Sequence, residues 1–145
     1  MNIMQPTVLA YRTLNAPFDN YAITEDGKLY RKEHYSMKKT KMTKAGVKNE
    51  FNKHFTERPV KDHKNKRTGY HQVCIRKTGF NEKIGFTKYI HELVAEQFIG
   101  LRPEGYQVDH KDGNRSNNHC ANLEYVTRSE NIKRMWKRKL AKEGV

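Results

Sequence analysis

The last forty residues constrain the fold most, because their pattern predicts a strand, a polar loop, a second strand and a helix in succession. Residues 106–110 and 123–126 have the composition of short strands, and the loop between them contains Asp-Gly and Asn-Asn pairs that favour turns. Thr127 and Glu130 have the spacing of a helix capping box, and apolar residues then recur at helical spacing. The sequence therefore predicts a ββα unit over residues 106–142.

Shorter elements are expected before this unit. Residues 90–99 have the apolar spacing of a helix that ends at Gly100. Residues 68–76 alternate as a half-buried strand does, and a second strand is expected near residues 83–88. Two β-prone runs within residues 21–31 flank an Asp-Gly turn, which indicates a hairpin.

These elements predict an α+β fold. It consists of a small ββα core preceded by a helix and short β-strands, with an N-terminal β-hairpin module and a basic arm. The expected divisions are residues 1–33 for the hairpin module, 34–67 for the arm or linker, and 68–145 for the domain that contains the ββα core. The arm has few apolar anchors, so we expect it to be extended or partly disordered and to become ordered against nucleic acid.

The positive charge is concentrated in two segments. The chain has 145 residues and a formal net charge of +13. Residues 31–88 carry +12 and residues 132–145 carry +5, while residues 1–30 carry −1 and residues 89–131 carry −3. A dense basic block disfavours compaction unless an anion neutralises it, so the charge predicts contact with phosphate backbones.

Other classes of protein are disfavoured by composition. Only 35% of residues are hydrophobic, and no apolar run approaches the length of a membrane span or a signal sequence. Two cysteines, Cys74 and Cys120, form neither a disulfide framework nor a four-thiolate zinc site. We expect a cytoplasmic protein without membrane contact, whose partner is DNA or RNA.

Polar residues that could take part in catalysis or metal binding lie within the predicted ββα unit. Asp109 and His110 end its first strand, and Asn131 falls in the first turn of its helix. The fold can bring the oxygens of Asp109 and Asn131 together, and two hard oxygen ligands suit Mg²⁺ or Mn²⁺. His110 would face the same cleft as a general base, because an imidazole can accept a proton at neutral pH. Asn122 could accept a hydrogen bond from the imidazole and fix its tautomer.

The same residues also permit simpler interpretations. Asp109, His110 and the residues that follow could form an ordinary turn, and Asn131 could be a helix-terminus residue. Spacing alone leaves both interpretations open.

A family resemblance covers this region. Its motifs are Ile90-His91-Glu92-Leu93-Val94-Ala95, Val108-Asp109-His110-Lys111-Asp112-Gly113-Asn114, Asn117-Asn118, Ala121-Asn122-Leu123 and Ser129-Glu130-Asn131. This succession resembles the HNH endonucleases, and especially the homing endonuclease branch found in phages and self-splicing introns. More weakly, residues 21–30 resemble the small N-terminal module that often precedes the domain in that branch.

The resemblance implies a metal-dependent endonuclease with a ββα-metal site. His110 would be the general base, Asp109 and Asn131 would hold one divalent metal on the scissile phosphate, and Asn122 would orient His110. Asn131 stands where other branches have a histidine. The implied products are a 5′-phosphate and a 3′-hydroxyl, from nicking or cutting double-stranded DNA. Mg²⁺ is the expected ion and Mn²⁺ the alternative.

Basic side chains of the arm and the C-terminal segment are expected to bind phosphates, and the protein is expected to act as a monomer. These side chains are Lys38, Lys39, Lys41, Lys44, Lys64, Lys66, Arg67, Lys133, Arg134 and Lys137. An alternative function is a non-catalytic basic DNA- or RNA-binding module on the same scaffold.

Three residues near the motifs have open roles. His119 and Cys120 replace the more usual basic-apolar pair of the family. His119 could be an extra ligand, a phosphate contact or a bystander, and Cys120 is expected to pack under the loop because a single thiolate matches an oxygen-rich site poorly. His91 is expected to have a structural role.

Overall fold

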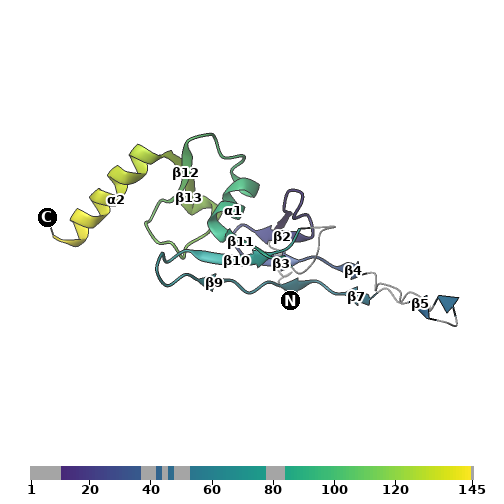
Figure 1. Cartoon of the computed structure of the whole chain (residues 1–145). Helices are drawn as coiled ribbons and strands as arrows, with labels where there is room; N and C mark the ends of the chain where they lie inside the picture. Colours follow the sequence, from purple (N-terminus) through teal and green to yellow (C-terminus); the bar gives the residue numbers. More distant parts are fainter. Residues whose placement is uncertain (1–10, 37–41, 44–45, 48–52, 78–83, 145) are drawn as a thin grey trace, which may run out of the picture.

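The computed structural model describes residues 11–36, 42–43, 46–47, 53–77 and 84–144, and it has short antiparallel strands around one helix, with a second helix projecting from one end (Figure 1). In chain order the elements are β1 (Tyr11–Thr13), β2 (Tyr21–Thr24), β3 (Leu29–Arg31), β4 (His34–Ser36), β5 (Met42–Thr43), β6 (Gly46–Val47), β7 (Lys53–Phe55), β8 (Arg58–Pro59), β9 (His63–Lys64), β10 (His71–Ile75), β11 (Phe86–Tyr89), α1 (Ile90–Phe98), β12 (Tyr106–His110), the 3₁₀ turn η1 (Cys120–Asn122), β13 (Leu123–Thr127) and α2 (Arg128–Lys142). The predicted α+β class is confirmed. Neither described helix is long and apolar enough to cross a membrane.

The predicted ββα unit is present. Strands β12 and β13 pair antiparallel, with Tyr106 opposite Thr127 at one end and His110 opposite Leu123 at the other. Helix α2 begins directly after β13, where the Glu130 backbone N–H donates to Thr127 Oγ1 at 3.2 Å. The predicted cap at Thr127 is therefore confirmed.

The expected N-terminal hairpin is also present, within a larger sheet. Strands β1, β2, β3 and β8 form one antiparallel sheet in that order, and β11, β10 and β9 form another. Gly27 lies in the β2–β3 turn with φ +87°, a conformation that favours glycine. A Cβ at Gly27 would approach Ile90 Cγ2 to 2.7 Å and Asn118 Cβ to 3.1 Å. The turn thus packs closely against α1 and the loop between β12 and β13.

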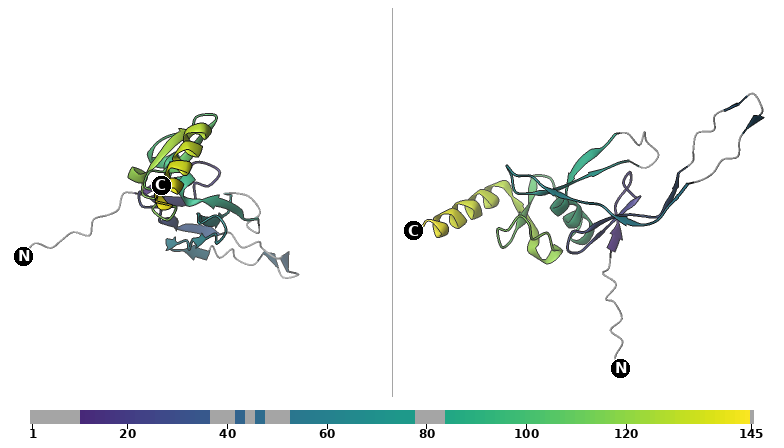
Figure 2. Two further views of the ribbon diagram at one scale, coloured as in Figure 1. Left: turned by 90° about the vertical axis from the view of Figure 1, so that its left-hand side faces the viewer. Right: turned by 90° about the horizontal axis from the view of Figure 1, so that it is seen from below.

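The described parts of the basic arm include short paired strands. Strand β4 pairs with β7 in a ribbon. This ribbon projects from the end of the molecule that lies opposite α2 (Figure 2). Strands β8 and β9 then join the edges of the two larger sheets. These strands are extended because they pair within the protein, and ordering of the arm against nucleic acid stays a prediction. Lys38, Lys39, Lys41 and Lys44 lie outside the described residues.

One hydrophobic core connects the predicted segments. It contains Leu14, Tyr21, Ile23 and Leu29 from the N-terminal sheet; Val73 and Ile75 from β10; Ile90, Leu93, Val94 and Ala95 from α1; and Leu123 from β13. The N-terminal hairpin and the ββα unit consequently share their buried surface. The expected division into three segments stays a prediction. The core contains residues of both the first segment, 1–33, and the third, 68–145.

Candidate active site

The polar loop between β12 and β13 is held by its own side chains. Asp112 accepts hydrogen bonds from the Asn114 backbone at 2.7 Å, from Asn122 Nδ2 at 2.9 Å and from Asn117 Nδ2 at 2.9 Å. These bonds, that from Asn117 first, hold the pKa of Asp112 below its ordinary value. Lys111 N donates to the Asn122 carbonyl at 2.8 Å and closes the base of the loop. The loop therefore presents the end of β12 in a fixed position.

His110 is buried at the end of β12, with 3% of its surface exposed, and is oriented by Asn118. Its Nε2 lies 2.9 Å from Asn118 Oδ1. Because an amide oxygen only accepts hydrogen bonds, Nε2 must carry the proton, and Nδ1 keeps the lone pair. The imidazole also packs against the rings of His91 and Tyr70, with centroids 5.2 and 6.0 Å away. His110 is thus held in the tautomer that leaves Nδ1 as the basic atom.

Asn122 has different contacts from those that the resemblance implies. Its side-chain oxygen accepts from Asp112 N at 3.1 Å, and its Nδ2 donates to Asp112 and to the Asn117 carbonyl. In the described structure His110 Nε2 donates its hydrogen bond to Asn118 Oδ1 instead. Nothing in the sequence motif separates the two asparagines, so the position of Asn118 becomes visible only in the folded loop. The orienting role of Asn122 stays a prediction.

Asp109 is buried beside two arginines of α2. Arg138 Nη1 and Nη2 and Arg134 Nη1 each lie 3.1 Å from its carboxylate oxygens. Burial by itself raises the pKa of Asp109, but the hydrogen bonds from Arg138 and Arg134 outweigh it and hold this pKa below its ordinary value. Arg138 also donates to the His110 carbonyl at 2.9 Å. The ionised carboxylate is therefore fixed against the middle of α2.

Asn131 lies in the first turn of α2, where its Nδ2 donates to Gln107 Oε1 at 2.9 Å. This bond leaves Asn131 Oδ1 as the atom that can serve as a ligand. Asp109, His110 and Asn131 line one pocket of about 820 Å³ between β12, the polar loop and α2. The structure thus brings together three of the four residues that the sequence singled out.

Cationic side chains surround the same pocket. They are Lys64, Arg115, Arg138, Lys139 and Lys142. Of these only Lys64 was predicted, although the helical spacing of Asn131, Met135, Arg138 and Lys142 places all four on one face and could have indicated the last two. Basic residues on the wall of a pocket that also holds carboxylate and imidazole groups suit a phosphate ester.

The other predicted basic residues have different surroundings. Lys66, Arg67, Lys133 and Lys137 are exposed and do not line this pocket. Arg134 forms ion pairs with Glu124, Glu130 and Asp109, with Glu124 the main cause of its raised pKa. Its positive charge is largely compensated within the protein, so it contributes less to attracting an anion than its sequence position suggests.

The donor set fits a hard divalent cation. A carboxylate oxygen of Asp109 and the amide oxygen of Asn131 are the ligand types that Mg²⁺ and Mn²⁺ prefer. Both Asp109 oxygens accept hydrogen bonds from guanidinium groups. A cation that binds this carboxylate would therefore replace one of those hydrogen bonds. The pocket thus contains oxygen atoms of these ligand types from β12 and α2.

The ββα unit that contains this pocket is similar to a class of protein, the HNH endonucleases. Residues 88–133 match the family model described as HNH endonuclease, so the resemblance predicted from the motifs is confirmed. Members of the family generally use a divalent metal.

Individual relatives can also be named. The chain is 40% identical over 76 residues to DNA endonuclease I-HmuI of Bacillus phage SP01, a match that covers 52% of this chain and 41% of that protein. It is 47% identical over 58 residues to the SPbeta prophage-derived putative HNH homing endonuclease YosQ of Bacillus subtilis (strain 168), which covers 34% of each.

A solved structure has the same fold. The structure titled "DNA binding and cleavage by the HNH homing endonuclease I-HmuI" superposes with a TM-score of 0.62 and 27% sequence identity, over 90% of this chain and 60% of that one. The two sequence matches cover 41% and 34% of the curated relatives, so the chain spans less than half of their length. The likeness extends beyond the ββα unit to most of the described fold.

Proposed function

We propose that this protein is a metal-dependent endonuclease that hydrolyses phosphodiester bonds of double-stranded DNA. The observation that carries the proposal is the convergence of Asp109, His110 and Asn131 on one pocket lined by cations. The solved relative binds and cleaves DNA according to its title, which supports DNA as the substrate. A cytoplasmic location and a monomeric state are part of the same proposal.

His110 is the general base in this proposal. Asn118 holds the proton on Nε2, so Nδ1 can take a proton from a water molecule in the pocket. Stacking against Tyr70 and a tilted contact with His91 prevent the ring from turning away. The loop that fixes Asn118 thereby also fixes the direction from which water is activated.

Asp109 and Asn131 would hold the divalent metal, with Mg²⁺ expected and Mn²⁺ the alternative. When bound, the metal would act as a Lewis acid that stabilises negative charge on the scissile phosphate and on the leaving 3′ oxygen. Lys64, Arg115 and Lys139 bind flanking phosphates and hold the backbone against the pocket. The expected products are a 5′-phosphate and a 3′-hydroxyl, from a nick or a double-strand break.

The test is conversion of supercoiled plasmid by the purified protein, with Mg²⁺ or with EDTA. We expect nicking or linearisation that needs Mg²⁺ and that falls about 10²–10⁴-fold in His110→Ala. DNA affinity should stay nearly unchanged in this variant, because the imidazole is buried beside the loop. His63→Ala, at an exposed histidine of β9, is the matched control and should cleave normally.

Two results would contradict the proposal. Equal loss of cleavage and binding in His110→Ala would make His110 a structural residue. Binding without turnover, with Mg²⁺ or Mn²⁺ and with DNA of the source genome, would favour the non-catalytic binding module, in which Asp109 serves only as the partner of Arg138 and Arg134.

A further inference from the structure

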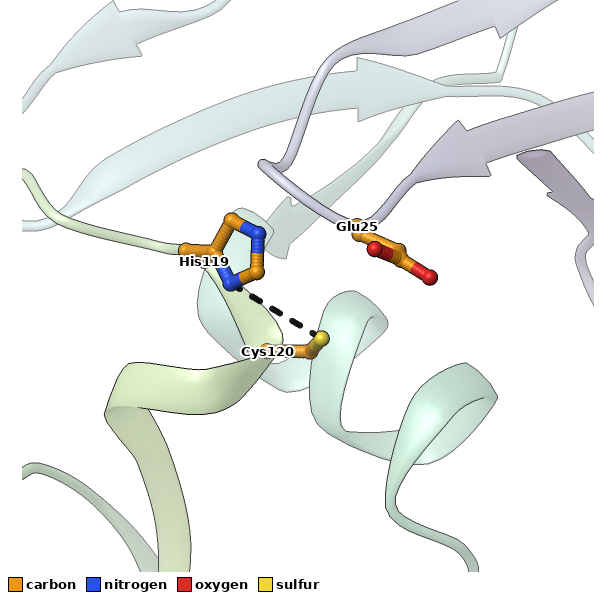
Figure 3. Close-up of side chains that lie close together, drawn as sticks. All are labelled: Glu25, His119 and Cys120. Carbon is orange, nitrogen blue, oxygen red and sulfur yellow. Dashed lines mark hydrogen bonds between the residues drawn. The ribbon is translucent and has the colours of Figure 1, made fainter. Parts of the chain in front are cut away.

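We propose that Glu25, His119 and Cys120 form a second metal site, of the kind that binds Zn²⁺. The carboxylate, imidazole and thiol of these residues each offer one ligand atom, and these atoms all lie within 4.8 Å of one another. Glu25 belongs to the β2–β3 turn, whereas His119 and Cys120 lie at the start of η1 (Figure 3). The three side chains therefore join segments that are far apart in the sequence. The inference does not depend on the proposed nuclease activity.

The backbone already holds the two segments together. Cys120 N donates to the Glu25 carbonyl at 2.8 Å, and the close approach of Gly27 to Asn118 fixes the turn against the same loop. The ligands are thus brought together by main-chain contacts that do not depend on an ion. Such preorganisation lowers the entropy cost of binding, since only the side chains must be ordered.

The side chains are available for binding. In the described part of the chain no hydrogen bond or ion pair involves the Glu25 carboxylate, and Cys120 is a free cysteine, partly exposed beside the core. Cys120 Sγ lies 3.9 Å from His119 Nδ1, and the other ring nitrogen lies toward Glu25 (Figure 3). A charged carboxylate next to a thiol and an imidazole is an arrangement that a cation would stabilise.

The separations suit a small tetrahedral ion after a modest contraction. Zinc bonds of about 2.3 Å to sulfur and about 2.1 Å to nitrogen place neighbouring ligand atoms about 3.6 Å apart. The Cys120–His119 pair is already close to this value, and rotation of the Glu25 side chain can supply the rest. Water would complete the coordination, as it does at zinc sites with three protein ligands.

Binding would exchange one backbone hydrogen bond. His119 Nδ1 accepts a hydrogen bond from Ala121 N at 3.1 Å. If Nδ1 binds the metal, its lone pair is no longer available to Ala121 N. If Nε2 binds the metal instead, Nδ1 carries the proton and cannot accept the hydrogen bond either. The Cys120 thiol releases its proton to solvent on coordination, because the thiolate is the ligand. No other reactant is needed.

Ligand chemistry separates this site from the pocket of Asp109 and Asn131. Sulfur and imidazole favour Zn²⁺ and similar borderline ions, whereas the oxygen pair favours Mg²⁺. A bound ion would link the N-terminal hairpin to the loop that contains Asn118, the partner of His110. We therefore infer that the second site stabilises the hairpin against the loop.

The test is titration of the full chain with Co²⁺, followed by Zn²⁺, in the presence of excess Mg²⁺. We expect one Co²⁺ per chain with a thiolate-to-cobalt charge-transfer band, displacement by Zn²⁺, and a rise of Tm with Zn²⁺. Cys120→Ala should abolish the band and weaken metal binding by more than about 100-fold. This loss is larger than that expected from removing a residue that only hydrogen-bonds to a metal ligand. His119→Gln and Glu25→Gln should weaken binding and keep the metal-free fold, since both side chains are near the surface.

Matched controls identify the site. Cys74→Ala removes the other cysteine of the chain and should leave the charge-transfer band and the metal stoichiometry unchanged. Absence of stoichiometric binding, or a band that survives in Cys120→Ala, would overturn the proposal. So would Co²⁺ binding that is unaffected by the Cys120, His119 and Glu25 substitutions but lost in Asp109→Asn, because the ion would then occupy the nuclease pocket.

Discussion

The two helices of this protein have similar apolar spacing in the sequence but different environments in the fold. Five of the nine residues of α1 are buried, and its first residue has no side-chain cap. Helix α2 has no buried residue, and Ile132, Met135, Trp136 and Leu140 are each between 43% and 51% exposed. It contacts the rest of the molecule through the Thr127 cap, the hydrogen bond of Asn131 to Gln107, and the ion pairs and hydrogen bonds of Arg134 and Arg138. Helix α1 is thus part of the core, whereas α2 presents a surface that walls the pocket.

The sharpest test of this contrast replaces one leucine in each helix. Leu93 of α1 is 7% exposed and Leu140 of α2 is 45% exposed. We expect Leu93→Ala to lower the free energy of unfolding by about 2–5 kcal/mol, because it leaves a cavity in the core. Leu140→Ala should change it by less than about 0.5 kcal/mol. Urea denaturation measures both, and equal losses would show that α2 packs against the core as α1 does.

The contrast also explains what sequence reasoning could predict. Periodicity and capping signals are local, so the β2–β3 hairpin, β10, α1 and the ββα unit were all predicted, with small differences at their ends. Which helix enters the core depends on distant partners, and the spacing of Ile132 and Leu140 contains no information about them. The strands β8 and β9 were missed for the same reason, since each is two residues long and exists only through pairing with β3 or β10.

The candidate site shows the same division. Asp109, His110 and Asn131 were found because motif spacing and a family resemblance both indicate them. Asn118 and Arg138 were missed as contacts of His110 and Asp109, because their positions depend on how the loop and α2 fold back onto β12. Lys139 and Lys142 belong to the basic C-terminal segment that was expected to bind phosphates but were not singled out. Helical spacing from Asn131 could have indicated Lys142, whereas only the pocket indicates Lys139.

A second prediction concerns the buried histidine of α1. His91 is 7% exposed, stacks against Tyr70 at 4.7 Å between centroids, and has a buried Nδ1 without a hydrogen-bond partner in the described structure. Burial, followed by the charges of His110, Arg102 and Arg115, lowers the pKa of His91 to about 3.

The sign of the pH effect follows from this shift. Below about pH 6.5 the unfolded chain binds a proton at His91 that the folded chain does not, so the stability present above that pH is lost as the pH falls toward 3. The slope from this one group approaches about 1.4 kcal/mol per pH unit. We expect His91→Phe to remove this component from the difference in unfolding free energy between about pH 7 and pH 5. His63→Phe is the control at an exposed histidine, and a slope unchanged in His91→Phe would contradict the shift.

The smallest expected effect tests whether α2 binds DNA through one face. Lys139 and Lys142 line the pocket, whereas Lys133 and Lys137 are exposed on the same helix and do not. Each phosphate contact contributes about 0.9 to the slope of log affinity against log salt concentration, so replacing both pocket lysines by glutamine should reduce the slope by about 1.8.

The matched pair is Lys133→Gln with Lys137→Gln, which removes the same formal charge from the same helix. We expect it to change the slope by less than half as much, in binding measured with EDTA so that no cleavage occurs. Equal changes for the two pairs would show that α2 attracts DNA through its overall charge. A change confined to the pocket pair would instead show that this face of α2 follows the phosphate backbone beside Asp109 and His110, as expected of a helix that remains outside the core.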